Sequence, residues 1–420
     1  MTPDAERTDS PQPPAPDSVA EMAAAPDWQR TLFIMMGIQV GMNIGFTVLS
    51  PVMPLFLPEL GVQGASQINL WSGILAAVTP LVATFASPLW GRVADRRGRK
   101  LMVLRSCFAI SLFIGLMSLA ANVWQFLGLR GLMGIFAGFN AAAISLVASQ
   151  VPARRLGYSL GWLSTGQLVG TLIGPLLGGL IADTTGSYRA PFVFTAAICV
   201  LCGVLTLVLV RERFTAPKPT AAKATIFQSF AVLARAPGLM PLFVVLLLAQ
   251  FGVQAVQPVV TLYVEELVGP VGALATLGGL AFSVTGLADL IASPFLGRRS
   301  DTLGYRRVLL ISLTGAALAS APQAFVPDYW SFVAARFALG LFVGGILPTA
   351  NALVGRLAPA GDRGLVYGVT ASAMFLGSSL GPLSGGAIAA TLGLHWVFLI
   401  TALLLAINLA WVWVKVPEVR

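Results

Sequence analysis

The sequence predicts an all-α membrane protein with twelve transmembrane helices, arranged as two pseudo-symmetric bundles of six. Three observations predict this fold class. Only 10% of the 420 residues are charged, 56% are hydrophobic and mean hydropathy is +0.83, whereas about a quarter of the residues of a soluble domain are charged. The chain also carries twelve long apolar stretches, and its second half repeats its first.

The apolar stretches define the elements in chain order. Each is long enough for the roughly 20 residues that a helix needs to cross the hydrocarbon core. Lipid offers the backbone no hydrogen-bond partner, so each stretch should be helical. The stretches run over residues 31–57, 68–90, 101–120, 123–148, 157–182, 190–210, 239–263, 273–297, 307–325, 329–354, 364–390 and 395–414.

These spans divide the chain into two bundles. We expect the first six-helix bundle over 28–211 and the second over 239–415, joined by a basic cytoplasmic linker over 212–238. Residues 1–27 are rich in proline, alanine and acid, a composition typical of a disordered cytoplasmic tail. Residues 416–420 form a short cytoplasmic C-terminal tail.

The basic residues predict the orientation. If the N-terminus is cytoplasmic, all but three of the 26 Lys and Arg residues fall on the cytoplasmic side, the exceptions being Arg130, Arg189 and Arg336. We therefore expect a multi-pass protein of the cell inner membrane with both termini in the cytoplasm. The net charge of +9 is explained by this topology, so we expect no nucleic-acid partner.

The two halves repeat at a nearly constant offset. So many matches at one spacing indicate a duplicated six-helix unit, an arrangement that places a substrate site between the repeats near the membrane midplane. Matches 206 residues apart are Pro88, Gly91, Asp95, Arg130, Gly134 and Gly138 with Pro294, Gly297, Asp301, Arg336, Gly340 and Gly344. Matches 207 residues apart are Gly170, Gly174, Pro175, Gly178 and Gly179 with Gly377, Gly381, Pro382, Gly385 and Gly386.

Metal, redox and cofactor chemistry is not indicated. The three cysteines, Cys107, Cys199 and Cys202, lie in apolar runs where cysteine behaves as a small hydrophobe. His395 is the single histidine, so a multi-histidine metal site is excluded. No nucleophile–base set or phosphate loop is present. We expect no metal, no cofactor and no enzymatic activity.

The loop GRVADRRGRK at 91–100 resembles the signature loop of the major facilitator superfamily. A weaker twin, GRRSDTLGYRR, lies at 297–307 in the second half. The resemblance implies the major facilitator fold and a conformational latch between the halves. Its residues would be Gly91, Asp95, Arg96, Gly98, Arg99 and Asp301. A carboxylate here can dock on the positive N-terminus of a helix, so we expect Asp95 near Arg363 and Asp301 near Arg155.

Two glycine–proline runs narrow the family. GTLIGPLLGG at 170–179 and GSSLGPLSGG at 377–386, with GFTVLSPVMP at 45–54, resemble motifs of the twelve-span drug:proton antiporter family. Small residues allow close helix approach and prolines loosen the helical hydrogen bonds. The antiporter motif residues are Gly170, Gly174, Pro175, Gly178, Gly179, Gly377, Gly381 and Pro382.

The resemblance covers about residues 28–415, and stretches such as TLYVEEL at 261–267 are similar to a branch of bacterial multidrug exporters. It implies proton-coupled efflux of small amphiphilic molecules or drugs across the inner membrane by alternating access. The implied partners are protons, a small-molecule substrate and the lipid bilayer, and we expect the transporter to be a monomer.

Two polar stripes predict the substrate site. Gln39, Asn43 and Thr47 share one face of the first span, because they are spaced four residues apart. Gln250, Gln254 and Gln257 repeat this pattern in the seventh span. We expect the paired stripes to face a shared aqueous cavity. Hydrogen bonding between helices is the alternative for any single residue.

Charged residues within spans are the candidates for proton coupling. Asp289 is the one acid well inside a predicted span, and burial disfavours its charged form, so we expect it to take up and release the coupling proton. Arg130 and Arg336 would tune the electrostatic field at Asp289. The alternative role for Asp289 is a structural ion pair with an arginine. Other acids, such as Asp183, lie at outer ends and should be solvated. Because the spans contain two arginines and one aspartate, we expect the substrates to be neutral, zwitterionic or anionic amphiphiles.

Three other functions stay open at this point. An exporter dedicated to one metabolite, such as a siderophore or a sugar, has the same motifs as a multidrug exporter. A proton-coupled importer can use the same fold, although the glycine–proline motif favours an antiporter. A membrane enzyme or receptor would need a catalytic set or a sensor domain, and the sequence offers neither.

Overall fold

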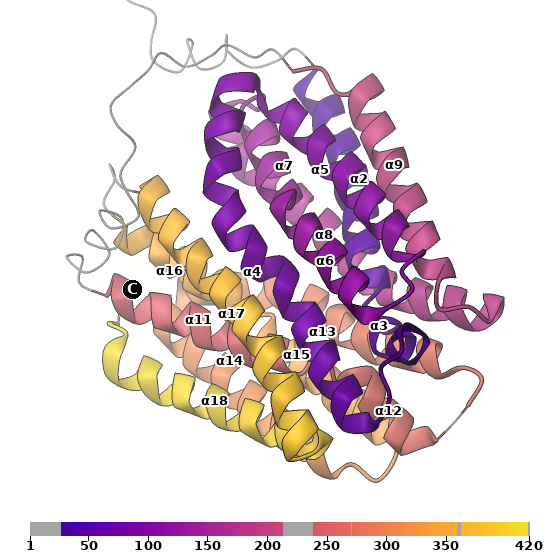
Figure 1. Ribbon diagram of the computed structural model, residues 1–420. Coiled ribbons are helices and arrows are strands. Elements are labelled where there is room, and N and C mark those ends of the chain that lie inside the picture. The colour runs from indigo at the N-terminus through magenta and orange to yellow at the C-terminus, as the bar shows by residue number, and fades with distance from the viewer. Residues whose placement is uncertain (1–26, 213–237, 270, 359–362, 419–420) are drawn as a thin grey trace, which may run out of the picture.

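The computed structural model describes residues 27–212, 238–269, 271–358 and 363–418, without the side chains at 88, 91, 92, 95, 153 and 363–365. Twelve helical segments within these ranges are long and apolar enough to cross a membrane. They form two bundles of six, the first in indigo to magenta and the second in orange to yellow in Figure 1. The predicted tail at 1–27 and linker at 212–238 fall almost wholly outside the described residues.

The first bundle contains six spans. In chain order its elements are α2 (Trp28–Val48), α3 (Met53–Phe56), η1 (Leu57–Leu60), α4 (Ala65–Arg97), α5 (Arg99–Met117), α6 (Val123–Ile135), α7 (Phe139–Ala148), η2 (Ala153–Arg155), α8 (Leu156–Thr185) and α9 (Ala190–Leu209).

The second bundle repeats this order. Its elements are α11 (Leu239–Ala255), α12 (Val260–Val268), α13 (Leu274–Leu303), α14 (Tyr305–Ser320), η3 (Ala321–Phe325), α15 (Tyr329–Val343), α16 (Ile346–Leu357), α17 (Arg363–Thr391) and α18 (Leu394–Lys415).

Four spans are interrupted, and the interruptions are related by the repeat. The first and seventh spans break after Val48 and Ala255, just before Pro51 and Pro258, which lack the N–H that a continuing helix needs. The fourth span breaks between α6 and α7, where Gly138 has a φ of 116°. The tenth breaks between α15 and α16. Each half therefore offers non-helical backbone inside the membrane region.

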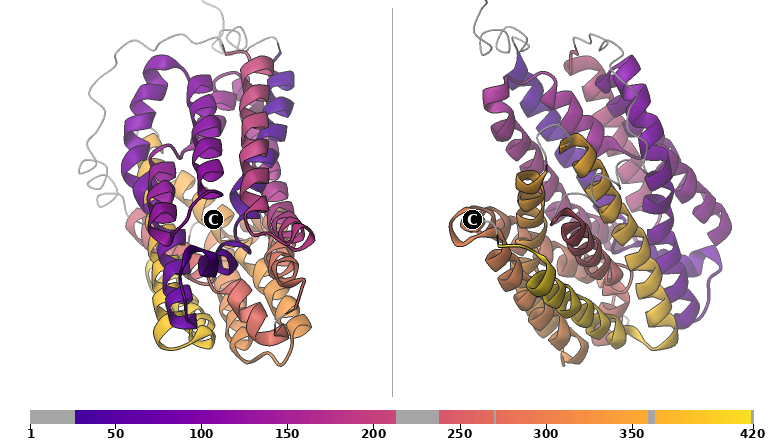
Figure 2. Two further views of the ribbon diagram at one scale, coloured as in Figure 1. Left: turned by 45° about the vertical axis from the view of Figure 1, so that its right-hand side comes forward. Right: turned by 90° about the vertical axis from the view of Figure 1, so that its left-hand side faces the viewer.

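The two bundles meet at one end and diverge toward the other (Figures 1 and 2). They meet where α4 begins and α17 finishes: Ser66 Oγ donates to the Ala390 carbonyl at 2.8 Å, and Asn69 Nδ2 to the Ala389 carbonyl at 3.2 Å. We call this the closed end. The opposite end holds Trp28, Lys415 and most basic residues of the described chain, and we call it the basic end.

The outer surface is apolar, as a lipid-facing surface requires. Large side chains such as Phe85, Leu119 and Leu318 are 72%, 76% and 70% exposed. Trp124 and Trp330, 206 residues apart, stand exposed at the starts of α6 and α15, where tryptophan marks a membrane–water interface.

Candidate functional site

The polar stripe of the first span packs against its own bundle. Gln39 and Asn43 are 1% and 5% exposed, and Thr47 is half-buried. Gln39 Nε2 donates to Asn140 Oδ1 on α7 at 2.7 Å, and Asn43 Nδ2 donates to the Gln39 carbonyl at 2.8 Å. Gln39 Oε1 is buried with no hydrogen bond from a described residue. The stripe therefore joins the first span to the fourth and leaves one buried acceptor open.

Glycines of the fifth span make room for this stripe. A Cβ added at Gly170 would lie 2.6 Å from Asn43 Cβ, and one at Gly174 would collide with Thr47 Oγ1. Thr47 Oγ1 also lies 3.3 Å from the Gly170 carbonyl, to which it can donate. The close approach of α8 to α2 therefore depends on these glycines.

The stripe of the seventh span repeats the arrangement. Gln250, Gln254 and Gln257 are each half-buried on α11 or just after it. Gln250 Nε2 donates to Ser378 Oγ on α17 at 2.9 Å, and a Cβ added at Gly377 would lie 2.8 Å from Gln250 Cβ. Both stripes are thus flanked by the glycine face of a partner helix within the same bundle.

Two further glycines of these runs face the opposite bundle. A Cβ added at Gly179 would lie 2.6 Å from Thr276 Cα on α13, and one at Gly386 would lie 2.7 Å from Gly73 Cα on α4. The glycine faces of α8 and α17 therefore allow close contact between the two bundles as well as within each bundle. The motif glycines that face the first or seventh span of their own bundle are Gly170, Gly174, Gly178, Gly377 and Gly381.

The motif prolines lie at the same inter-bundle contact. Pro175 is inside α8 and Pro382 inside α17. Each packs against a glycine of the opposite bundle. A Cβ added at Gly279 would clash with the Pro175 carbonyl oxygen, and one added at Gly73 would clash with the Pro382 carbonyl oxygen. Because proline donates no backbone hydrogen bond, the helices are loosened where the halves touch.

Arg130 and Arg336 lie toward the closed end, on α6 and α15. Arg130 Nη1 is 3.1 Å from Met53 Sδ, while Arg336 is 4% exposed and lies 5.9 Å from the centroid of the Phe282 ring. The Nε atom of each is buried without a hydrogen-bond partner among the described residues. No ion pair joins either to a described acid. Each half therefore carries an arginine within a span, half-buried at Arg130 and buried at Arg336, without a described counter-ion.

Asp289 lies on α13 against the break between α15 and α16. Ser293 Oγ is 2.7 Å from Asp289 Oδ1 and 2.8 Å from the Gly344 carbonyl. A Cβ added at Gly344 would lie 2.7 Å from the same Oδ1. Arg336 precedes Gly344 by eight residues, about 12 Å of helix. The structure does not pair Asp289 with a described arginine. The carboxyl group is half-buried beside a helix break, with the Ser293 hydroxyl as its hydrogen-bond partner.

The corresponding break in the fourth span has a cationic cap that the sequence reasoning missed. Arg105 Nη2 donates to the carbonyls of Phe136 and Ala137 at 3.2 and 3.1 Å. Trp90 Nε1 donates to the Ile135 carbonyl at 2.6 Å, and the Arg105 guanidinium lies 3.7 Å from the Trp90 ring centroid. The available signal was Arg105 itself, an arginine inside the apolar stretch at 101–120.

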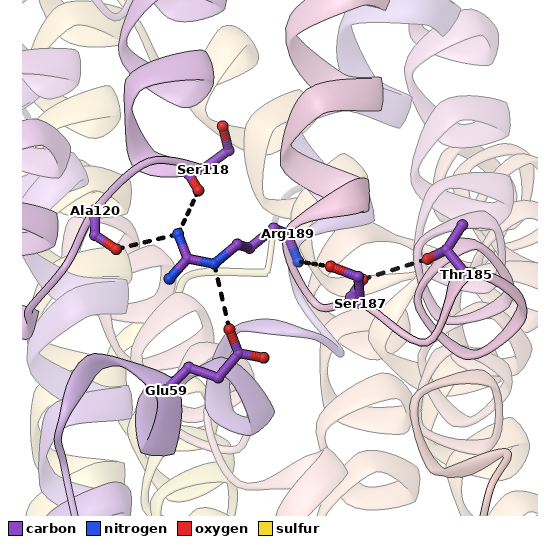
Figure 3. A network of polar contacts seen from close by, with 6 residues as sticks. All are labelled: Glu59, Ser118, Ala120, Thr185, Ser187 and Arg189. Carbon is purple, nitrogen blue, oxygen red and sulfur yellow. Dashed lines mark hydrogen bonds and ion pairs between the residues drawn. The ribbon is translucent and has the colours of Figure 1, made fainter.

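Arg189 holds together the closed end of the first bundle (Figure 3). Its Nη1 donates to the carbonyls of Ser118 and Ala120 at 2.6 and 3.2 Å, and its Nε lies 3.4 Å from Glu59 Oε2. Figure 3 shows the guanidinium between the end of α5 and η1. Arg189, which the predicted topology places in an outer loop, therefore links its own segment to the end of α5 and to η1.

Asp183 joins the two bundles, so the expectation that it is merely solvated was wrong. Its Oδ2 accepts a hydrogen bond from the Thr276 backbone N at 2.7 Å. Thr276 lies in the first turn of α13, where a carboxylate is stabilised by the free N–H groups of the helix. The predicted type of contact, an acid of one half on a helix N-terminus of the other, therefore occurs at the closed end.

The predicted latch residues lie at the basic end. Gly98, with a φ of 93°, ends α4 and starts α5. The backbone N–H groups of Arg99 and Lys100 each donate to the Glu212 carboxylate at 2.8 Å, so an acid of the same bundle caps α5. Arg96 is exposed. The first-half turn is therefore stabilised locally.

Of the two pairs expected between the halves, the one between Asp301 and Arg155 is not formed in this structure. Asp301 is exposed and accepts a hydrogen bond from the Tyr305 hydroxyl, and it has no ion pair with Arg155. The side chains of Asp95 and Arg363 lie outside the described part of the chain, as does that of Gly91. The physical reason for the open Asp301 pair is that the bundles diverge at this end.

Comparison with known proteins agrees with this architecture. The family model described as Major Facilitator Superfamily matches residues 35–278 and 242–420. "Multidrug resistance protein MdtG" of Serratia proteamaculans (strain 568) is 40% identical over 93% of this chain and 96% of its own. The Escherichia fergusonii protein of the same name is 38% identical over 94% and 97%.

A solved structure shares the fold at low identity. It is described as a bacterial homolog to the human lysosomal transporter Spinster in an inward-facing and unoccupied conformation, and it is 17% identical over 93% of this chain and 97% of its own, with a TM-score of 0.74. The repeated halves, the interrupted spans and the family match lead to one conclusion: this chain belongs to the major facilitator superfamily.

Proposed function

We propose that this chain is a proton-coupled exporter of small amphiphilic molecules that acts by alternating access in the cell inner membrane. The observation that carries the proposal is Asp289, a half-buried carboxyl group beside a break in the tenth span with no described basic partner. Such a group can bind a proton in one conformation and release it in another, because access of water changes the cost of its charge. Identities near 40% to proteins named for multidrug resistance support export.

The basic end is the cytoplasmic end in this proposal, with both termini inside, because cytoplasmic loops carry the excess of Lys and Arg. The structure then represents an inward-open monomer. Substrate would enter between the bundles and contact Gln39, Gln250 and Gln254. The Nε atoms of Arg130 and Arg336 are buried, and neither residue has a described counter-ion. These two cations favour a substrate that is neutral, zwitterionic or anionic.

Asp289→Asn tests the proposal in proteoliposomes. The variant should lose uphill, proton-driven substrate transport and substrate-induced proton release, while keeping substrate exchange down a gradient. Asp328→Asn is the matched control: Asp328 caps α15 through the Ser331 backbone N at 3.0 Å, and asparagine caps a helix equally well. Its proton coupling should match that of the unmodified chain.

Undiminished proton release in Asp289→Asn would show that another group carries the proton. Accumulation of substrate inside right-side-out vesicles, driven by a proton gradient, would identify an importer and reject export.

A further inference from the structure

The tenth span contains a carbonyl group that its own helix cannot satisfy. In an α-helix the carbonyl of residue i accepts from the N–H of residue i+4. Four residues after Gly344 stands Pro348, which has no N–H. The helix is accordingly interrupted by a turn between α15, which ends at Val343, and α16, which begins at Ile346.

Ser293 supplies the missing donor from a neighbouring span. Its Oγ lies 2.8 Å from the Gly344 carbonyl and 2.7 Å from Asp289 Oδ1. A serine hydroxyl has one proton to donate. When the Asp289 carboxylate is ionised, the two acceptors compete for that proton. When Asp289 is protonated, its O–H can donate to Ser293 Oγ, and the Ser293 O–H is free to donate to Gly344.

The pseudo-equivalent break in the fourth span lacks this dependence on a proton. There the carbonyls are capped by the Arg105 guanidinium, which stays charged at every physiological pH. The residues 206 positions before Asp289 and Ser293 are Ala83 and Ser87, and Ser87 Oγ donates to the Ala83 carbonyl of its own helix at 2.6 Å. The break in the fourth span is thus capped by a permanent charge, whereas the cap of the break in the tenth span depends on a titratable carboxyl group.

The charged groups of the surrounding helices do not reach Asp289. Those on the elements packed against α13 are Glu265 and Glu266 of α12, Arg336 of α15, Arg356 of α16, Arg306 and Arg307 of α14 and Asp183 of α8, with Arg155 just before α8 and Arg298, Arg299 and Asp301 on α13 itself. None of these described groups forms an ion pair with Asp289. The Ser293 hydroxyl is therefore the contact through which its protonation acts on the protein.

We propose that Ser293 is a positioning residue that transmits the protonation state of Asp289 to the break in the tenth span. The inference rests on the proposed function, in which Asp289 carries the proton. Protonation completes the chain from the Asp289 carboxyl through the Ser293 hydroxyl to the Gly344 carbonyl and holds α16 in the position seen here. Release of the proton draws the Ser293 hydroxyl to the carboxylate, and the Gly344 carbonyl loses its donor.

This arrangement fixes a direction for the effect of pH. The conformation open at the basic end contains the completed chain, so it binds the proton more tightly and is favoured at low pH. Raising the pH should close the basic end. Spin labels at Tyr158→Cys on α8 and Leu303→Cys on α13, both exposed at that end, report the separation of the bundles in lipid nanodiscs.

Two variants break the transmission while leaving the Asp289 carboxyl group itself in place. Ser293→Ala removes the hydroxyl, and Pro348→Ala returns an N–H to the Gly344 carbonyl, which then no longer needs Ser293. In both, the label separation should stop responding to pH, while substrate-induced proton release persists. Ser293→Thr keeps a hydroxyl and should respond like the unmodified chain. Ser87→Ala, the pseudo-equivalent control, should keep the full response.

The outcomes separate the two proposals. If Asp289→Asn loses proton release but Pro348→Ala and Ser293→Ala keep the full pH response, Asp289 carries the proton and the inference about Ser293 is wrong. If Asp289→Asn keeps proton release, the proposed function itself fails. Loss of the pH response in both variants, with rescue by Ser293→Thr, supports transmission.

Discussion

At the scale of single residues, polar side chains inside the spans differ in how far their hydrogen bonds are satisfied within the chain. Asn408 on α18 is fully buried, and its Nδ2 donates to the Val245 carbonyl at 3.1 Å. Gln254 on α11 is half-buried and makes no side-chain hydrogen bond to another described residue. The first holds two helices together, whereas the second makes no side-chain hydrogen bond within the described chain that the proposed substrate contact would have to replace.

We therefore expect opposite results from two alanine substitutions. Gln254→Ala should weaken substrate binding about tenfold, the effect of losing one hydrogen bond of ~1.4 kcal/mol, with little change in melting temperature. Asn408→Ala should lower the melting temperature and leave substrate affinity unchanged. Binding is measured by ligand quenching of tryptophan fluorescence, and stability by thermal unfolding in detergent. A stability loss in Gln254→Ala with unchanged affinity would assign it to helix packing.

Much of the candidate site could be predicted at this scale, and the missing part has a definite cause. Helical spacing placed Gln39, Asn43 and Thr47 on one face, and that face is buried in the structure. Spacing cannot say which helix lies opposite, so the partner Asn140 was not found. Asp289 stood out because it is charged, but its contact with Gly344 depends on a backbone break that residue type alone does not indicate.

At the scale of elements, the glycine faces of α8 and α17 decide how closely helices approach. Alanine normally stabilises a helix by about 1 kcal/mol relative to glycine. At Gly179 that gain is outweighed, because a Cβ would lie 2.5 Å from the Ala275 backbone carbon on α13, which no side-chain rotation can relieve. At Gly161 on the same helix, an added Cβ meets nothing within 4 Å.

Gly179→Ala should therefore hold the closed end apart and slow transport at least about tenfold, the effect of ~1.4 kcal/mol on one step of the cycle. Gly161→Ala should leave the transport rate unchanged and raise the melting temperature slightly. Transport rates are compared in proteoliposomes at equal protein amounts. Equal rates in the two variants would contradict the close contact of α8 with α13.

Hydropathy located all twelve spans but not their ends or interruptions. α4 continues to Arg97 and α13 to Leu303, beyond the apolar stretches at 68–90 and 273–297, because a helix can project from the membrane once its side chains are polar. A span broken by one non-helical turn has the same mean hydropathy as a continuous one. The breaks were marked only by single residues: Pro51, Pro258, Gly138 and Pro348.

At the scale of the whole molecule, the internal repeat predicts two halves that rock about a shared site, and in the proposed mechanism the structure represents one extreme of that motion. The contacts between halves lie at the closed end, through Ser66, Asn69 and Asp183. Sequence could not select this conformation, since both extremes use the same residues and differ only in which end is closed. Alternating access requires these closed-end contacts to break in every cycle.

A disulfide across the closed end should therefore stop transport reversibly. Ser66 Oγ lies 2.8 Å from the carbonyl oxygen of Ala390, so cysteines at these two positions join the start of α4 to the end of α17. The experiment starts from a chain in which the buried Cys107, Cys199 and Cys202 are replaced by alanine or serine. Oxidation of Ser66→Cys/Ala390→Cys should abolish export while substrate still binds from the basic end, and dithiothreitol should restore export. Each single-cysteine chain should be indifferent to oxidation. Full export by the cross-linked chain would mean that the closed end never opens, and the rocking of two halves would have to be abandoned.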